Sequence, residues 1–222
     1  MKIISVDVAR TTWLFPITEL NSAGRSLTNV FLQMRDKYKF KKFPTHTVDT
    51  DPQTNALVFD QGEFRNRNGI LVLVKMTIFN DGIVADCYSS TRDSDDFLKD
   101  LMNWIKTEQN LSLPPDRVIK TLYLSELTVS TGKGLAWLNP RMEEFARKLS
   151  EKMSSEGREN AGYTFGGFAL WPRDWNRLGA PAHFRFELKL ASQPGENRYY
   201  TAAPLTTDDH LELLQEQEDM LF

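Results

Sequence analysis

Cysteine is almost absent from this chain, which has one in 222 residues. Cys87 cannot form an intrachain disulfide, and the strand-like run IVADCYSS around it is apolar enough to bury a free thiol as a small hydrophobic group. Such a setting disfavours the reactive thiolate, so we expect no cysteine nucleophile. A lone unpaired cysteine is typical of a reducing compartment, and we expect a cytoplasmic protein.

Long apolar runs and linkers are also lacking. No window reaches the roughly 18 apolar residues that cross a bilayer, and the N-terminal MKIISVDVARTTWLF has no apolar core or cleavage site of a signal peptide. No stretch rich in Pro, Gly or Ser divides the chain. We therefore expect neither secretion nor membrane insertion, and a single domain over residues 1–222 whose segment 207–222 is a terminal helix or a docking tail.

Histidine is scarce too, with three in the chain, and only His46 has carboxylates nearby, Asp49 and Asp51. Alternation along a strand would place His46 and Asp49 on opposite faces, and their spacing matches no common metal-ligand pattern. A polar loop with turns before Pro52 is the favoured interpretation. We expect neither a metal nor a cofactor.

Catalytic signatures are missing as well. STGKGLAW lacks the first glycine of a phosphate loop and has Gly134 where Ser or Thr must follow the lysine, and FGGF lacks the third glycine of a dinucleotide fingerprint. Among 30 acidic residues nothing selects a catalytic pair. We therefore assign no catalytic residue, and an enzyme with an unrecognised site remains an alternative.

Apolar periodicity is present and predicts both helices and strands. One hairpin is expected from ILVLVKMTIF and IVADCYS, joined in a tight turn by Asn80, Asp81 and Gly82, residue types that tolerate positive φ. Further strands are expected in VIKTLYLSELTV, FGGFALWPRDW, HFRFELKL and RYYTAA. The alternation of HFRFELKL predicts that Phe184, Phe186, Leu188 and Leu190 face inward.

A helix is expected over about 26–38 behind the capping-type residues Ser22 and Ser26, with an apolar stripe of Leu27, Val30, Phe31, Met34 and Tyr38. Further helices are expected from a cap at Ser94, from Asn139 and Pro140, and from Thr206 or Thr207. The helix after Pro140 has an apolar stripe of Met142, Phe145, Ala146, Leu149 and Met153.

Strands dominate two stretches, roughly 57–89 and 164–203, and a helix follows each. The order β-β-β-α is thus expected twice. Antiparallel hairpins without regular β-α alternation favour an α+β fold, with about four helices packed on antiparallel sheet.

KYKFKKFP, residues 37–44, alternates positive charge with aromatic rings. Single-stranded nucleic acid is bound by such a mixture through phosphate neutralisation and base stacking. The candidate nucleic-acid-binding residues are Lys37, Tyr38, Lys39, Phe40, Lys41 and Lys42. The alternative is a helix exit or edge strand whose rings are core and whose lysines discourage edge pairing, and the acidic pI of about 5.7 favours it.

The segment LWPRDWNRLGAPAHF carries Trp171, Arg173 and Trp175, residue types that anchor protein interfaces. Two tryptophans in one loop have to be covered, either by the chain's own sheet or by a partner. These three residues are therefore candidates for partner binding or self-association.

The last six residues, QEDMLF, resemble the bacterial sliding-clamp-binding motif Gln-x-x-Leu/Met-x-Phe, with Gln217 first, Met220 fourth and Phe222 last. The resemblance implies that these three side chains fill adjoining pockets on a clamp. The alternative is the last turn of an amphipathic helix that packs at home or in a dimer.

The sequence as a whole favours a non-enzymatic, cytoplasmic interaction or assembly protein that works through its aromatic loops and C-terminal tail. The alternative is an accessory protein of DNA replication or repair that binds a sliding clamp and single-stranded DNA.

Overall fold

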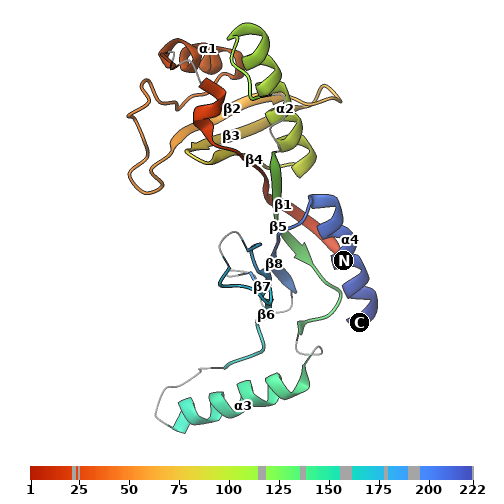
Figure 1. The fold of residues 1–222 in the computed structure, drawn as a ribbon. Coiled ribbons are helices and arrows are strands. Elements are labelled where there is room, and N and C mark those ends of the chain that lie inside the picture. The colour runs from red at the N-terminus through yellow and green to blue at the C-terminus, as the bar shows by residue number, and fades with distance from the viewer. Residues whose placement is uncertain are drawn as a thin grey trace. The chain divides into compact units, whose positions relative to one another are not determined.

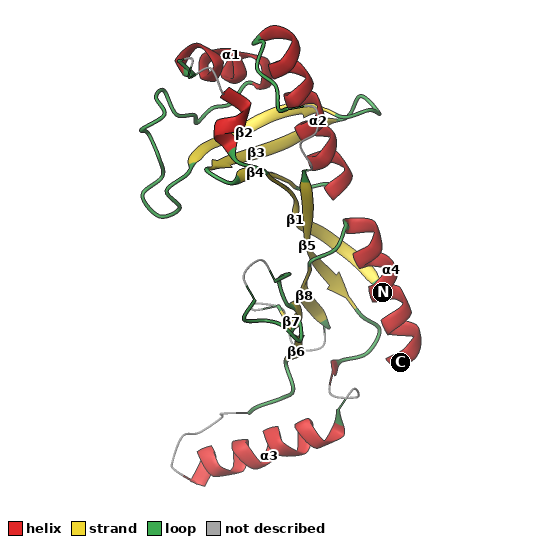
Figure 2. Ribbon diagram, in the orientation of Figure 1, coloured by secondary structure: helices red, strands yellow, loops and turns green. Residues whose placement is uncertain are grey.

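The computed structural model describes residues 1–21, 24, 26–114, 119–135, 139–155, 162–177, 180–189 and 196–221. These residues form an antiparallel sheet of eight strands with four α-helices, which confirms the predicted α+β fold (Figures 1 and 2). The strands are β1 (Lys2–Leu14), β2 (Leu57–Arg65), β3 (Leu71–Phe79), β4 (Gly82–Cys87), β5 (Lys120–Ser130), β6 (Gly167–Leu170), β7 (Phe184–Leu188) and β8 (Arg198–Ala203). The helices are α1 (Thr28–Tyr38), α2 (Thr91–Glu108), α3 (Pro140–Ser155) and α4 (Thr207–Leu221), with a short 3-10 helix, η1 (Ile17–Asn21). None of the described helices is both long and apolar enough to cross a membrane.

The element order occurs twice along the chain. A strand, a helix, three strands and a helix make up each copy: β1-α1-β2-β3-β4-α2, then β5-α3-β6-β7-β8-α4. The order in the sheet is β2-β3-β4-β1-β5-β8-β7-β6. Outward from β1 come β4, β3 and β2, and outward from β5 come β8, β7 and β6, so corresponding strands of the two copies follow in the same order. The predicted double β-β-β-α order is therefore confirmed, and it extends to one more strand and one more helix in each copy.

The chain forms two compact units. The N-terminal unit comprises residues 6–125 and 204–208, and the C-terminal unit comprises residues 1–5, 126–203 and 209–222. Both units take residues from β1 and β5. The single domain expected over residues 1–222 stays a prediction.

The predicted hairpin is present as β3 and β4, which pair from Val74 opposite Cys87 to Phe79 opposite Gly82. Asn80 and Asp81 make its tight turn, as predicted, and neither residue has a positive φ. Gly82 is needed for another reason, because a Cβ there would collide with the backbone oxygen of Trp13 on β1. The glycine therefore permits close pairing of β4 with β1.

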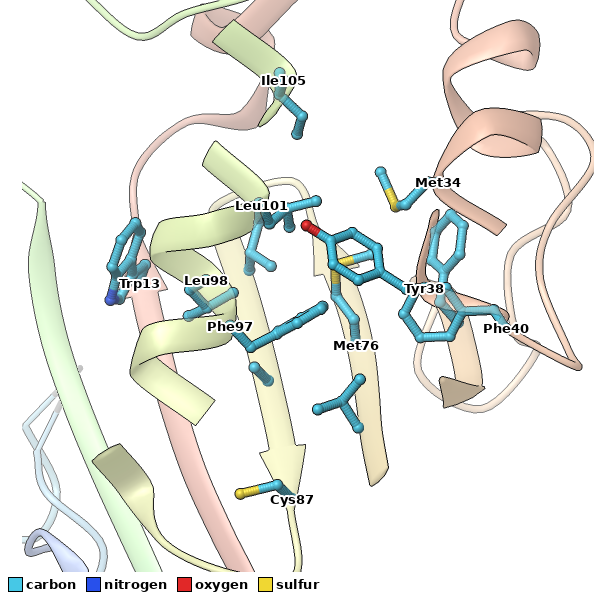
Figure 3. Close-up of a cluster of buried hydrophobic side chains, with 14 of the residues drawn as sticks. Trp13, Met34, Tyr38, Phe40, Met76, Cys87, Phe97, Leu98, Leu101 and Ile105 are labelled. Carbon is cyan, nitrogen blue, oxygen red and sulfur yellow. The ribbon is translucent and has the colours of Figure 1, made fainter. Parts of the chain in front are cut away.

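The core of the N-terminal unit lies between α1, α2 and the strands β3 and β4. Figure 3 shows Phe97, Leu98 and Leu101 of α2 gathered with Met34 and Tyr38 of α1 beside these strands. The predicted apolar stripe of α1 is confirmed, since its buried residues are Val30, Phe31, Met34 and Tyr38. Several aromatic edges meet there, so burial is combined with favourable ring geometry.

Two helix starts differ from the prediction. The cap of α2 is Ser90, whose side chain accepts a hydrogen bond from the Asp93 amide, and not Ser94. Ser94 is instead buried within the helix, with its hydroxyl 2.7 Å from that of Thr11. The residue before α1 is Leu27, which makes no side-chain cap, so this helix depends on packing more than on capping.

The first turns of α2 and α4 are joined by a reciprocal pair of hydrogen bonds. The Thr91 amide donates to the Thr207 hydroxyl at 3.0 Å, and the Thr207 amide donates to the Thr91 hydroxyl at 2.9 Å. Both threonines are buried, and each begins its helix. Each hydroxyl thus satisfies a helix-start amide that water does not reach.

Replacement of Thr207 by valine is expected to lower the free energy of unfolding by about 1–3 kcal/mol, since it leaves the buried Thr91 amide without its acceptor. Urea unfolding measures this loss. Thr107→Val, the same change at an exposed position of α2, is the control and should cost much less. Equal costs for the two variants would contradict the role of the pair.

In the C-terminal unit, rings stack across three strands. Phe168 on β6 stacks on Phe186 of β7 at 5.9 Å, and Phe186 stacks on Tyr199 of β8 at 4.9 Å. Phe186 is buried as the alternation of β7 predicts, but Leu188 is 43% exposed, so the prediction of an inward Leu188 is wrong. Leu190, also predicted inward, lies outside the described residues.

Helix α3 begins as predicted, with the Met142 amide donating to Asn139 Oδ1 at 3.3 Å and Pro140 as its first residue. Its apolar stripe is covered only in part: of the 16 residues of α3, all of them described, Ala146 alone is buried, and Leu149 and Met153 are half-buried. Phe145 is 63% exposed, whereas the corresponding helix of the first copy, α1, buries its stripe.

Candidate functional site

An exposed aromatic surface lies at the end of β6 in the C-terminal unit. It consists of Trp171, Trp175 and His183, which are called the aromatic surface below; Leu170, the residue before Trp171, is also exposed. Leu170 and Trp171 are each 61% exposed and Trp175 is 65% exposed. Large apolar side chains with this exposure are informative when they are contiguous, because monomeric proteins rarely display such patches without use.

The rings of the aromatic surface are held in a fixed arrangement. Trp171 and His183 stack with ring centroids 4.3 Å apart and planes 10° apart, and Trp175 meets Trp171 edge to face at 6.4 Å. The stack follows from the antiparallel register of β6 and β7, in which Leu170 lies opposite Phe184. This register places Trp171, which follows Leu170, opposite His183, which precedes Phe184. The chain supporting Trp175 turns tightly, with the Arg177 amide donating to the Asp174 oxygen at 2.9 Å.

Charges of both signs border these rings. Arg173, Asp174 and Arg177 are all exposed, and they lie in the same turn as Trp175. The strand β6 is the last in the sheet order, with no further strand paired to it in the part of the chain that the structure describes. The arrangement therefore offers an apolar centre, a mixed-charge rim and a row of strand backbone groups.

The structure brings together two of the three residues predicted from this loop, since Trp171 and Trp175 are in contact and Arg173 lies between them in sequence. His183 and Leu170 were missed. No local signal identifies His183, because its contact with Trp171 depends on the pairing of β6 with β7. Leu170 is missed because, in FGGFALW, a leucine in a short strand is ordinarily expected to be core.

In KYKFKKFP, the rings of Tyr38 and Phe40 and the lysine side chains differ in burial. Tyr38 and Phe40 are buried in the N-terminal unit, so their rings are not accessible for base stacking in this conformation. The four lysines are exposed; Lys37 pairs with Asp100 at 3.0 Å and Lys39 with Glu63 at 3.1 Å. The geometry is that of the alternative interpretation, a helix exit with core rings and outward lysines.

Backbone bonds attach the same segment to β2. The Asp60 amide donates to the Lys42 oxygen at 2.8 Å, and the amides of Lys41 and Lys42 both donate to the Asp60 oxygen. The exposed lysines thus lie along that strand, where positive charge discourages pairing with another chain. Binding of nucleic acid by Lys37, Lys39, Lys41 and Lys42 stays a prediction.

The tail is helical in backbone up to Leu221, so Gln217 and Met220 lie within α4. Phe222 lies outside the described residues. Leu214 on this helix is buried, and His210, also buried, has its Nε2 3.0 Å from the Thr201 hydroxyl. The predicted terminal helix is present in backbone, and both the packing of its last turn and the docking of Gln217, Met220 and Phe222 on a clamp stay predictions.

The His46 loop has the polar, turn-forming structure that was favoured. The Asp49 carboxylate accepts hydrogen bonds from the hydroxyl and amide of Thr45 and from the amide of His46, and these bonds lower the pKa of Asp49. Asp51 similarly caps the amides of Gln53 and Thr54. Across the residues with described positions, no group of three His, Cys, Asp or Glu side chains is placed to hold a metal ion.

Cys87 is buried and free, as predicted, and its sulfur lies 3.1 Å from the backbone oxygen of Ser90. In STGKGLAW, the Thr131 hydroxyl donates to the Lys133 oxygen at 2.6 Å, and residues 136–138 lie outside the described residues. The described part is thus a short hydrogen-bonded turn.

Comparisons with known proteins add no assignment. No protein-family model matches the chain, and no curated protein matches it significantly. Only the geometry of the chain's own residues therefore indicates a function.

Proposed function

We propose that this chain is a non-enzymatic interaction and assembly protein of the cytoplasm, and that it associates with a second copy of itself through the aromatic surface. The observation that carries the proposal is the pair of exposed, mutually contacting tryptophans, Trp171 and Trp175. Tryptophan is enriched among the residues that dominate binding energy at protein interfaces.

The fixed geometry of these rings supports binding. Because Trp171 is already stacked on His183, little side-chain entropy is lost when a partner covers it. Trp175, which meets Trp171 edge to face and is 65% exposed, extends the apolar area that association would remove from water.

The strand and the rim favour a second copy as the partner. Two β6 edges can pair antiparallel across a two-fold axis, which is the commonest symmetry of soluble dimers. Across that axis, Asp174 of one copy can meet Arg173 or Arg177 of the other, so the rim is complementary to itself in charge. The cytoplasmic assignment is supported by Cys87, a free and buried thiol.

The double variant Trp171→Ala/Trp175→Ala is expected to weaken self-association by at least about 30-fold, since loss of one interface hot spot costs about 2 kcal/mol or more. Light scattering with size-exclusion chromatography measures this over a dilution series. The full chain should reach twice its 25.6 kDa mass at high concentration while the variant stays monomeric.

Tyr88→Ala removes an equally exposed aromatic ring from the N-terminal unit, and it should leave the association unchanged. A monomeric full chain up to about 100 μM, weaker than most specific protein dimers, would overturn the proposal. So would a dimer that the tryptophan variant leaves intact.

A further inference from the structure

A cavity of about 210 Å³ lies in the N-terminal unit, apart from the aromatic surface. Helices α1 and α2 line it through Val30, Phe31, Met34, Leu101 and Ile105, and the sheet adds Leu57, Ile78 and Ile83. The 3-10 helix η1 adds Ile17 and Leu20 from the side. Several of these side chains, including Phe31, Met34 and Leu101, are otherwise part of the buried core.

The size of this cavity is unusual for a protein core. Interiors pack like organic crystals and have few voids larger than a water molecule, whose share of liquid volume is about 30 Å³. The cavity is partly open, and its apolar walls lack the dispersion contacts that a packed core would give them. An occupant that restored those contacts would stabilise the folded chain.

Backbone hydrogen bonds fix two of the segments that line the cavity. The Asn55 amide donates to the Asp51 oxygen, and the Asp51 amide donates to the Ala56 oxygen, both at 2.8 Å. On the other side, the Ile17 amide donates to the Asn80 oxygen at 2.9 Å, which fixes η1 against the hairpin turn. The loop before β2 and the start of η1 are therefore both fixed by backbone bonds.

The chemistry of the lining selects the occupant. Among the described residues that line the cavity there is no Lys, Arg, His, Asp or Glu, so a buried charge would have no partner. The polar lining residues come from η1, the loop before β2 and the hairpin turn: Asn21, Thr47, Thr50, Asn55 and Asn80. Neutral amides and hydroxyls of this kind can hydrogen-bond a neutral polar end while the walls cover a hydrocarbon.

We propose that this cavity binds a small uncharged apolar molecule, a hydrocarbon chain or ring system of about eight carbons with a neutral polar end at the Asn and Thr rim. The size follows by scaling from a cavity of about 150 Å³, which accepts the six carbons of benzene. Such a ligand restores the missing contacts of the core without burying a charge.

Octan-1-ol as the chain and indole as the ring are the probes, titrated into the full-length protein labelled with ¹³C at its methionine methyl groups. We expect a saturable shift of the Met34 signal, because Met34 lines the cavity. Met142, exposed on α3, should not shift. A shift with one probe and not the other identifies the ligand as a chain or a ring, and each result supports the proposal.

Ala56→Leu fills part of the cavity and should weaken binding by at least about tenfold, the effect of displacing two buried methylene groups of the ligand. Val30→Phe fills the opposite wall, so one variant remains informative if the other fails to fold. Ala182→Leu, the same change as the first at an exposed site in the C-terminal unit, should bind as the unmodified chain does. Absence of a saturable Met34 shift with both probes, or unaltered affinity in a folded filling variant, would overturn the proposal.

Discussion

Phe97→Ala is expected to lower the free energy of unfolding of the N-terminal unit by about 3–5 kcal/mol, the range for removing a fully buried phenylalanine. The ring of Phe97 lies 5.0 Å from that of Tyr38, 5.7 Å from Phe64 and 6.5 Å from Phe40, measured between centroids. Its removal therefore leaves a void that three rings from different elements border. Urea unfolding followed by circular dichroism measures the loss.

The chain offers a matched control in Phe145→Ala. Phe145 also lies inside a helix, so the change in helix propensity is the same, but its side chain is 63% exposed on α3. We expect a change within about 0.5 kcal/mol. Similar losses in the two variants would mean that the burial difference between α2 and α3 is not present in solution.

Tyr38→Phe is expected to cost about 1.5–3 kcal/mol near neutral pH, the usual contribution of a hydrogen bond to a charged group. The Tyr38 hydroxyl donates to the Asp100 carboxylate at 2.7 Å, and the ring is buried. Burial first, and then the hydrogen bond to Asp100, raise the pKa of Tyr38 far above its usual value.

The raised pKa also sets the pH dependence. Above about pH 10 the unfolded chain releases the Tyr38 proton while the folded chain retains it, so stability is lost as pH rises. The slope from this residue is about 1.4 kcal/mol per pH unit. The stability gap between the unmodified chain and Tyr38→Phe should therefore be full at pH 9 and narrower by about that amount at pH 11.

Urea unfolding of both proteins at the two pH values tests this, with Tyr88→Phe as the control because Tyr88 is exposed. A gap that stays constant between pH 9 and pH 11 would show that the Tyr38 hydroxyl titrates normally in the folded chain. In either case the comparison separates Tyr38 from every other group that loses a proton in this range, since those groups are common to both proteins.

The internal repeat makes the contrast between α1 and α3 informative. Both helices follow the first strand of their copy, and both carry an apolar stripe of helical spacing. In α1 the stripe is covered by the strands and by α2, whereas in α3 it is mostly exposed. An exposed stripe in the same unit as the aromatic surface is a further apolar area of the kind that assembly uses.

Local patterns of the sequence determined the elements. The apolar spacing in Val30, Phe31 and Met34, and the Asn139-Pro140 start of α3, indicate helices because periodicity and capping are properties of neighbouring residues. The same is true of the β3-β4 hairpin, whose turn lies where two β-rich runs meet. These local features were enough to predict an α+β fold with two similar halves.

Only the tertiary structure decided which apolar residues are covered. Tyr38 and Trp175 both stand beside charged residues in sequence, yet Tyr38 is buried and Trp175 is exposed, because burial depends on elements distant in the chain. The stack of Trp171 on His183 required the register of β6 with β7, and the cavity required helices, strands and loops between residues 17 and 111 to leave a space in common. Amphipathic spacing specifies that a side chain favours an apolar environment, and the three-dimensional packing specifies whether the chain itself supplies one.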